Sequence, residues 1–141
     1  MQNSLYPATS ISHDFPIQKP ERILGKKLDD LKLDPEKGFI HKDRRVMGMV
    51  QATVLPPDSV FLPILPVQSH EKLIFGLCAK CMKDKSVELC THTDRERAIT
   101  SVWTSAEIEF ACLEHNYRLV TVHEFFAYTT FAPVFKRFYT K

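Results

Sequence analysis

Residues 104–128 read TSAEIEFACLEHNYRLVTVHEFFAY, and this stretch decides the fold class. Its first four residues have the Thr-x-x-Glu form of a capping box, in which the Thr104 hydroxyl and the Glu107 carboxylate satisfy each other's orphan backbone donors. Apolar and partly apolar side chains follow at helical spacing, at Ile108, Ala111, Cys112 and His115. The pattern predicts a helix from about 105 to 116.

The second part of this stretch, Tyr117 to Tyr128, alternates as a strand in a sheet requires. One face would carry Leu119, Thr121, His123 and Phe125, and the other would carry Val120, Val122, Glu124 and Phe126. A capped helix that leads directly into a strand indicates an α+β fold, with one helix packed on a sheet of short strands.

Upstream of the helix, three further segments are rich in apolar and β-branched residues. Val46–Leu55 stops at Pro56-Pro57, and Phe61–Val67 and Lys72–Leu77 follow it. Each is typical of a strand, and a meander is the simplest topology for them. Residues 8–45 carry prolines, glycines and many charges, which predicts loop with one short helix around Lys26–Leu33.

The end of the chain has its own apolar stripe. Its spacing of i, i+3, i+4 and i+7 is that of one helix face, and it consists of Phe131, Val134, Phe135 and Phe138. Lys136, Arg137 and Lys141 lie off the stripe. We expect an amphipathic helix here, with no following segment on which its apolar face could pack.

Composition limits the possible partners and the compartment. The chain has 141 residues, 44% of them hydrophobic, which suits one domain with an ordinary core. Its net charge of +2 gives no strong global field, so any contact with nucleic acid must be local. Neither an apolar run of membrane-spanning length nor a secretory signal pattern is evident, and we expect an intracellular protein of the nucleus or cytoplasm that is not secreted.

Cys78-x-x-Cys81 and Cys90-x-His92 form the group with the most independent chemical content. Three thiolates and one imidazole complete a closed structural Zn²⁺ site. The alternative is that Cys78 and Cys81 are small buried residues at a strand end while Cys90 and His92 lie in a loop. Cys112, inside the predicted helix, is expected to be a core residue.

The segment after this group, Thr91–Arg97, has two interpretations. His92 and Asp94 could act as a base and its orienting carboxylate. The favoured interpretation is a solvated helix start that Thr93 caps, with Asp94 and Glu96 facing the positive end of the helix dipole.

Ser4-Leu5-Tyr6-Pro7 resembles the core of the first palm motif of protein-primed family B DNA polymerases, Asp-x-x-Ser-Leu-Tyr-Pro, from organelles, viruses and Polinton-type mobile elements. Other segments resemble these enzymes in the same order, so the resemblance covers nearly the whole chain. They are Phe15–Pro20, Val54–Pro57, Leu62–Pro66, Leu77–Cys81 and Cys90–Ala98. The family carries the same three cysteines and histidine at comparable spacing.

This resemblance implies Mg²⁺ in the intact enzyme, a dNTP substrate, primer-template DNA and a terminal priming protein. Backbone amides near Ser4 and Leu5 would face the triphosphate, and Tyr6 would exclude a ribose 2′-hydroxyl. Met1 stands where the family has its first metal-binding aspartate, and neither an Asp-Thr-Asp string nor the fingers lysine with Tyr-Gly occurs. No catalytic residue is therefore assigned. We expect an internal piece of a DNA-directed DNA polymerase that does not transfer nucleotides by itself.

The resemblance also implies a division of the chain. Residues 1–20 would be the remnant of the first palm motif and its loop, and residues 21–45 a polar linker. Residues 46–128 would be a small mixed α/β insertion like the terminal-protein region, which contains the Cys/His group. Residues 129–141 would be a helix that leads toward fingers, with the exonuclease, fingers and thumb missing.

A different class of protein also fits part of this pattern. A zinc-stapled, non-enzymatic module could bind a protein or a nucleic acid through an aromatic surface of Phe125, Phe126, Phe131, Phe135 and Phe138. It accounts for the cysteines and the aromatic C-terminal part. It does not account for Ser4–Pro7 or for the ordered series of proline-rich segments.

Overall fold

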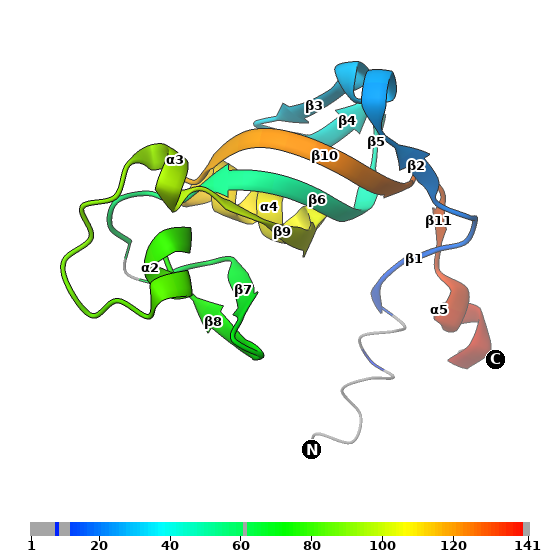
Figure 1. The fold of residues 1–141 in the computed structure, drawn as a ribbon. Helices are drawn as coiled ribbons and strands as arrows, with labels where there is room; N and C mark the ends of the chain where they lie inside the picture. The colour runs from blue at the N-terminus through cyan, green and yellow to red at the C-terminus, as the bar shows by residue number, and fades with distance from the viewer. Residues whose placement is uncertain (1–7, 9–11, 61, 140–141) are drawn as a thin grey trace.

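The computed structural model describes residues 8, 12–60 and 62–139. A four-stranded antiparallel sheet forms the centre, with one helix against one of its faces and smaller sheets around it (Figure 1). Helices and strands are both present, and the prediction of an α+β fold is confirmed.

The strands are β1 (Phe15–Pro16), β2 (Glu21–Ile23), β3 (Leu31–Asp34), β4 (Gly38–His41), β5 (Arg44–Arg45), β6 (Met47–Leu55), β7 (Pro66–Ser69), β8 (Lys72–Phe75), β9 (Ile99–Thr104), β10 (Arg118–Tyr128) and β11 (Phe131–Ala132). The helices are the 3₁₀ helix η2 (Gly25–Asp30) and the α-helices α2 (Ala79–Asp84), α3 (Asp94–Arg97), α4 (Ser105–Glu114) and α5 (Val134–Tyr139).

Helix α4 forms where its capping box predicts it. The Thr104 hydroxyl accepts from the Glu107 N–H at 3.2 Å, and the Glu107 carboxylate accepts from the Thr104 N–H at 3.1 Å. The face with Ile108 and Ala111 is fully buried against the central sheet. Both the capped helix and the following strand, β10, are confirmed.

The central sheet has the order β2-β10-β6-β9. Its core face carries Val50, Ala52 and Val54 from β6, together with Trp103 and Phe125 from its neighbours, all buried. The strict alternation predicted for β10 is wrong. The pairing of β10 with β6 shifts register between Leu119 and Thr121 and again between Val122 and Glu124, so Leu119, Val122 and Phe125 all pack on the core.

Gly48 in β6 is needed for this pairing. A Cβ on Gly48 would lie 1.8 Å from the backbone oxygen of Phe126, so only glycine fits here. The Gly48 N–H donates to the Ser105 hydroxyl at 3.1 Å, which ties the start of α4 to the sheet.

Residues 21–45, the expected polar linker, contain β2, η2 and the antiparallel sheet β3-β4-β5. The prediction of loop with one short helix is therefore wrong in this range, apart from η2, which overlaps the expected helix. Ile23 and Phe39 lie in the core without solvent exposure. Their strands are too short to produce a periodic pattern, and tertiary packing rather than local sequence determines their burial.

The predicted meander is also wrong. Among the described residues, β7 and β8 pair only with each other, while β6 pairs with β9 and β10. β9 was not predicted as a strand. It pairs with β6 at the position where a meander would place the strand that follows Pro57. The expected strand Phe61–Val67 is displaced toward the C-terminus, because β7 begins only at Pro66 and ends at Ser69. Phe61 lies outside the described residues.

Segments from both ends of the described chain lie together. β1 pairs with β11 (Figure 1). The Phe15 and Phe135 rings meet edge to face, with their centroids 4.9 Å apart. The C-terminal helix is present as α5, and its Val134 and Phe135 side chains remain exposed although the Phe135 ring meets Phe15. None of the described helices is long and apolar enough to span a bilayer.

Candidate metal centre

Helix α2 begins at the first of the two Cys-x-x-Cys thiols. Cys78 is its N-cap, and its sulfur accepts from the Cys81 N–H at 3.4 Å. This short helical turn directs both sulfurs to the same side. The chain then leaves α2 through Lys85 in a left-handed conformation and passes through an exposed loop to Cys90.

His92 brings the second pair of ligands to the first. Its Nδ1 atom lies 3.3 Å from the Cys78 sulfur, 3.2 Å from the Cys81 sulfur and 3.5 Å from the Cys90 sulfur. All four ligand atoms lie within 4.8 Å of one another. Thr93 follows immediately as the N-cap of α3, so the helix start fixes the backbone beside His92.

These separations suit one tetrahedral Zn²⁺. Zn–S bonds of about 2.3 Å and Zn–N bonds of about 2.0 Å at a tetrahedral angle place sulfur and nitrogen about 3.5 Å apart. Three thiolates and one imidazole form a closed site with no position for a reacting water, which is typical of structural zinc. The residues present therefore fit a Zn²⁺ that would staple the 78–92 loop to α3.

Two of the thiols have displaced pKa values. Burial, together with hydrogen bonds to Cys78 and Cys90, raises the pKa of Cys81 to about 12. The His92 backbone N–H, which donates to the Cys90 sulfur, lowers the pKa of Cys90 to about 7. Since a metal binds thiolates, zinc uptake by this group must release protons.

Arg97, at the end of α3, joins the Cys/His group to the central sheet. Its side chain is 8% exposed. Its Nη2 atom donates to the carbonyl oxygens of Pro56 at 2.9 Å, Pro57 at 3.0 Å and Leu77 at 3.4 Å. Leu77 directly precedes Cys78, so this arginine holds the first ligand's backbone against the end of β6. Its Nη1 atom pairs with Asp58 at 3.0 Å.

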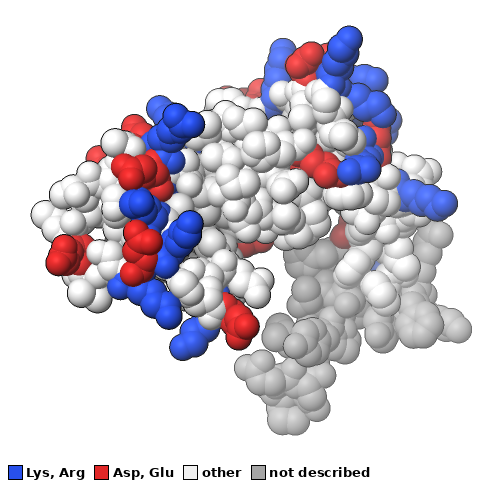
Figure 2. Space-filling model, viewed as in Figure 1, with Lys and Arg blue, Asp and Glu red and all other residues white. Residues whose placement is uncertain are grey.

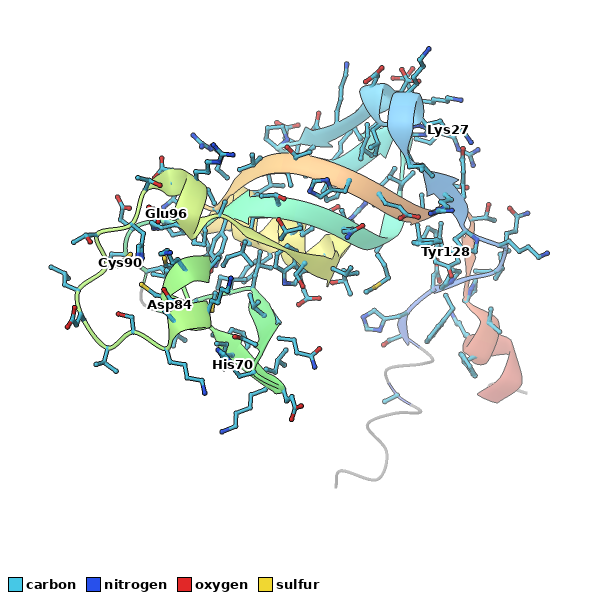
Figure 3. All side chains as sticks on the ribbon, viewed as in Figure 1. Lys27, His70, Asp84, Cys90, Glu96 and Tyr128 are labelled. Atoms are coloured by element: carbon cyan, nitrogen blue, oxygen red, sulfur yellow. The ribbon has the colours of Figure 1, made fainter. Side chains whose placement is uncertain are left out.

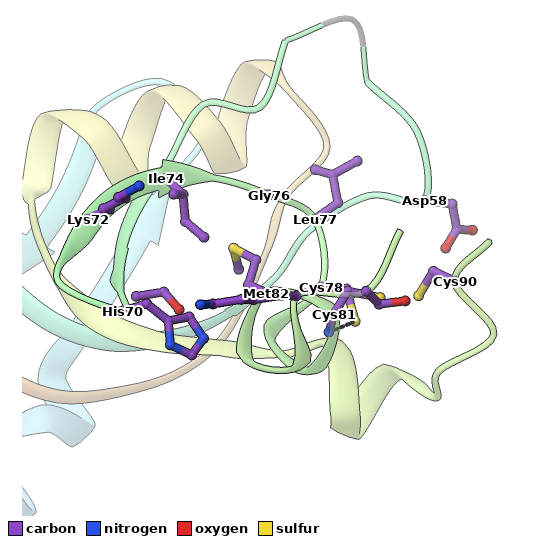
Figure 4. Close-up of a pocket in the computed structure, with 13 residues that line it drawn as sticks. Asp58, His70, Lys72, Ile74, Gly76, Leu77, Cys78, Cys81, Met82 and Cys90 are labelled. Carbon is purple, nitrogen blue, oxygen red and sulfur yellow. Dashed lines mark hydrogen bonds between the residues drawn. The ribbon is translucent and has the colours of Figure 1, made fainter. Parts of the chain in front are cut away.

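A cavity of about 730 Å³ lies beside the sulfurs (Figure 4). Its mostly apolar wall includes Ile74, Leu77 and Met82, and Asp58 and Cys90 lie at one end. Figure 3 shows Cys90 on the loop between α2 and α3, near the helix that carries Glu96. The cavity follows from the way the β7-β8 hairpin and α2 meet, where Gly76 leaves room for the Met82 side chain.

The structure brings together the four predicted metal ligands, while the nucleotide-binding residues implied by the resemblance, Ser4, Leu5 and Tyr6, lie outside the described residues. The capping interpretation of Thr93 is confirmed, because Thr93 and Glu96 form a capping box. Asp94 pairs with Arg97 at 3.5 Å rather than orienting His92. Cys112 packs against the core, as predicted, and burial raises its pKa to about 11.

The roles of two polar residues, Arg97 and His41, are not apparent from the sequence. Arg97 belongs to the segment expected as a solvated helix start, and His41 lies in a polar stretch. His41 is buried, with its Nε2 atom 3.0 Å from the Lys27 carbonyl oxygen. No sequence motif marks either side chain. For Arg97, the Pro56-Pro57 pair is the one available signal, because carbonyl oxygens without a strand partner need another hydrogen-bond donor when they are buried.

Comparison with known proteins gives the chain a family. The comparison with curated proteins found no match, and neither did the comparison with solved structures. The family model described as DNA polymerase type B, organellar and viral, matches residues 3–141. By this match across almost the whole sequence, the chain belongs to the type B DNA polymerases of organelles and viruses.

Proposed function

We propose that this chain serves DNA synthesis as a non-catalytic, zinc-stapled part of a type B DNA polymerase that contacts primer-template DNA. The family match over residues 3–141 carries this proposal, since template-primer and nucleotide are the substrates that the family implies. The same match argues against an unrelated zinc module, because it extends well beyond the Cys/His group.

Local charge supports the contact with DNA. Figure 2 shows Lys and Arg gathered over the region of η2 and β3–β5, and again around α2 and α3. Exposed basic side chains in the first region are Lys26, Lys27, Lys32, Lys37, Lys42, Arg44 and Arg45. Because the net charge of the chain is only +2, binding should depend on such local groups and weaken steeply with salt.

The 141-residue sequence does not supply the groups that nucleotidyl transfer requires. Two carboxylates must hold two metal ions about 4 Å apart. Met1 stands at the position of the first, and no Asp-Thr-Asp string supplies the second. The Mg²⁺-dependent step would then need residues outside this sequence, while Ser4, Leu5 and Tyr6 would contribute contacts to the nucleotide.

We also propose, from the resemblance, that residues 46–128 are an insertion like the terminal-protein region of these polymerases, with residues 21–45 packed on it through Ile23 and Phe39. In this arrangement Zn²⁺ would be held by Cys78, Cys81, Cys90 and His92 and would fix the exposed segment 85–92 after α2, whose Val87 and Leu89 side chains lie in solvent. A terminal priming protein would be the second macromolecular partner.

A band-shift experiment tests the contact with DNA. Purified protein is titrated into a labelled primer-template duplex from 50 to about 200 mM salt. We expect a shift at low salt that weakens as salt rises. The absence of any shift at the lowest salt would remove DNA binding from the proposal. A primer-extension assay with Mg²⁺ and dNTPs is the companion experiment, and extension of the primer by the purified chain would contradict a non-catalytic role.

Metal analysis tests the zinc staple separately. About one equivalent of zinc per chain is expected after purification without chelator. Less than about one tenth of an equivalent, with no uptake on addition of zinc, would exclude a tight structural site.

A further inference from the structure

A second cavity, of about 430 Å³, opens where α3 meets the ends of three sheet strands. Figure 1 places α3 beside the end of β6 and the start of β10. The wall of this cavity combines Thr53 of β6, Thr100 of β9, Arg95 of α3 and Arg118 of β10. The strand residues among them belong to the face of the sheet opposite the core, since Thr53 lies between the buried Ala52 and Val54.

Hydrogen-bonding groups line the floor of this cavity. The Thr53 hydroxyl lies 2.6 Å from the Thr100 hydroxyl and 2.8 Å from His123 Nε2. Thr53 and Thr100 are directly opposite in the β6–β9 pairing, and His123 is the extra residue at the second register shift of β10. The bulge therefore places the His123 imidazole, which does not itself line the cavity, against the Thr53 hydroxyl. If His123 donates to Thr53 and Thr53 donates to Thr100, the Thr100 hydroxyl keeps its hydrogen for an incoming oxyanion.

The two arginines carry charge that no described carboxylate neutralises. Arg95 and Arg118 are both exposed, and neither has a carboxylate within ion-pair distance among the described residues. Asp94 also borders the cavity, but its carboxylate pairs with Arg97 at 3.5 Å. The cavity thus keeps a positive charge next to neutral donors.

We propose that this cavity binds a phosphate group of the DNA backbone, an inference that rests on the proposed function. Planar guanidinium groups match phosphate oxygens in a bidentate fashion, and hydroxyl groups such as that of Thr100 complete such sites. The exposed Val120 at the rim gives an apolar surface for the adjoining sugar. The cavity is open on the sheet face. This openness suits a phosphate within a DNA strand, because the strand must continue past the site in both directions.

Salt-dependent DNA binding of charge-removing variants tests this site. The DNA affinities of Arg95→Gln and Arg118→Gln are measured by fluorescence anisotropy with a labelled duplex over a range of salt. Lys72→Gln, which removes an exposed charge on the β7-β8 hairpin, is the control. Each arginine variant should lower the slope of log Kobs against log salt by about 0.9, while Lys72→Gln leaves the slope unchanged. Unfolding midpoints of all three variants should match that of the unmodified protein, because the replaced side chains are exposed.

Titration with inorganic phosphate, followed by amide NMR, separates this inference from the proposed function. We expect phosphate to shift the amide signals of Arg95, Thr100 and Val120. In the double variant Arg95→Gln/Arg118→Gln, phosphate should no longer shift the signals at these positions. If the protein binds DNA, but phosphate leaves these signals unmoved and both arginine variants keep the full salt slope, the site is wrong and the proposed function stands. If phosphate moves these signals and no DNA binds, the oxyanion site stands with a free phosphate compound as its ligand, and the contact with DNA falls.

Discussion

The Phe39 and Phe125 rings meet edge to face in the core, with centroids 5.2 Å apart and ring planes at 78°. Both side chains are fully buried. Phe125 belongs to the long strand β10 of the central sheet, and Phe39 belongs to β4 of the small sheet. This contact makes the range 21–45 part of the same core as the central sheet.

Replacing either ring should therefore destabilise the whole fold. We expect Phe39→Ala and Phe125→Ala each to lower the free energy of unfolding by about 3–5 kcal/mol, through lost burial and a cavity. A double-mutant cycle should give a coupling of about 0.5–1.5 kcal/mol from the edge-to-face geometry. Chemical denaturation measures all four proteins. An effect below about 1 kcal/mol for Phe39→Ala would mean that β4 is not packed on the core.

Phe39 also shows where sequence-based prediction reaches its limit. The strand β10 and helix α4 could be predicted because each is long enough to show a period and α4 begins at a capping box. Phe39 lies in a four-residue strand between a turn and a charged segment. Its burial depends on Phe125, which is 86 positions further along the chain (125 − 39 = 86). No local pattern encodes that distance.

The Cys/His group could be predicted because its chemistry is local in sequence and metal ligands must be close in space. The two register shifts of β10 could not be predicted. They arise because Val120 and His123 are extra residues with no partner in β6, which depends on the pairing of two strands far apart in the sequence. Arg97 is a similar case: its acceptors, Pro56, Pro57 and Leu77, come from two separate segments that meet only in the folded protein.

The Cys/His group should lose zinc when one ligand is removed. Cys90→Ser is expected to lower bound zinc from about one equivalent to below about one tenth and to lower the thermal midpoint, because a three-ligand group holds Zn²⁺ weakly. Cys112→Ser, which removes a thiol that packs against the core, is the matched control and should keep its zinc. Elemental analysis after dialysis gives the answer. Equal zinc in both variants would mean that Cys90 is not a ligand.

Arg97 should stabilise the junction between the sheet and the Cys/His group. Arg97→Leu leaves the backbone oxygens of Pro56 and Pro57 without their donor, and we expect a loss of about 2–3 kcal/mol in the free energy of unfolding. Arg95→Leu, at an exposed position of the same helix, should change stability by less than about 0.5 kcal/mol. Urea denaturation with an unchanged m-value distinguishes the two. Similar midpoints for both variants would argue that Arg97 is dispensable.

Asp34 should make stability sensitive to acid. Its carboxylate accepts from the backbone N–H groups of Glu36 at 2.8 Å and Lys37 at 2.9 Å, and these hydrogen bonds lower its pKa below the ordinary value of 3.8. A lowered folded-state pKa contributes stability that is present above the unfolded-state pKa and is lost as pH falls through the folded-state pKa. We therefore expect the urea midpoint to decrease below about pH 4 and to decrease less steeply in Asp34→Asn. The carboxyl carbon shift of Asp34, followed by NMR in folded and urea-unfolded protein, measures the two pKa values directly. A folded-state value equal to or above the unfolded one would show that the turn between β3 and β4 does not hold the charged carboxylate.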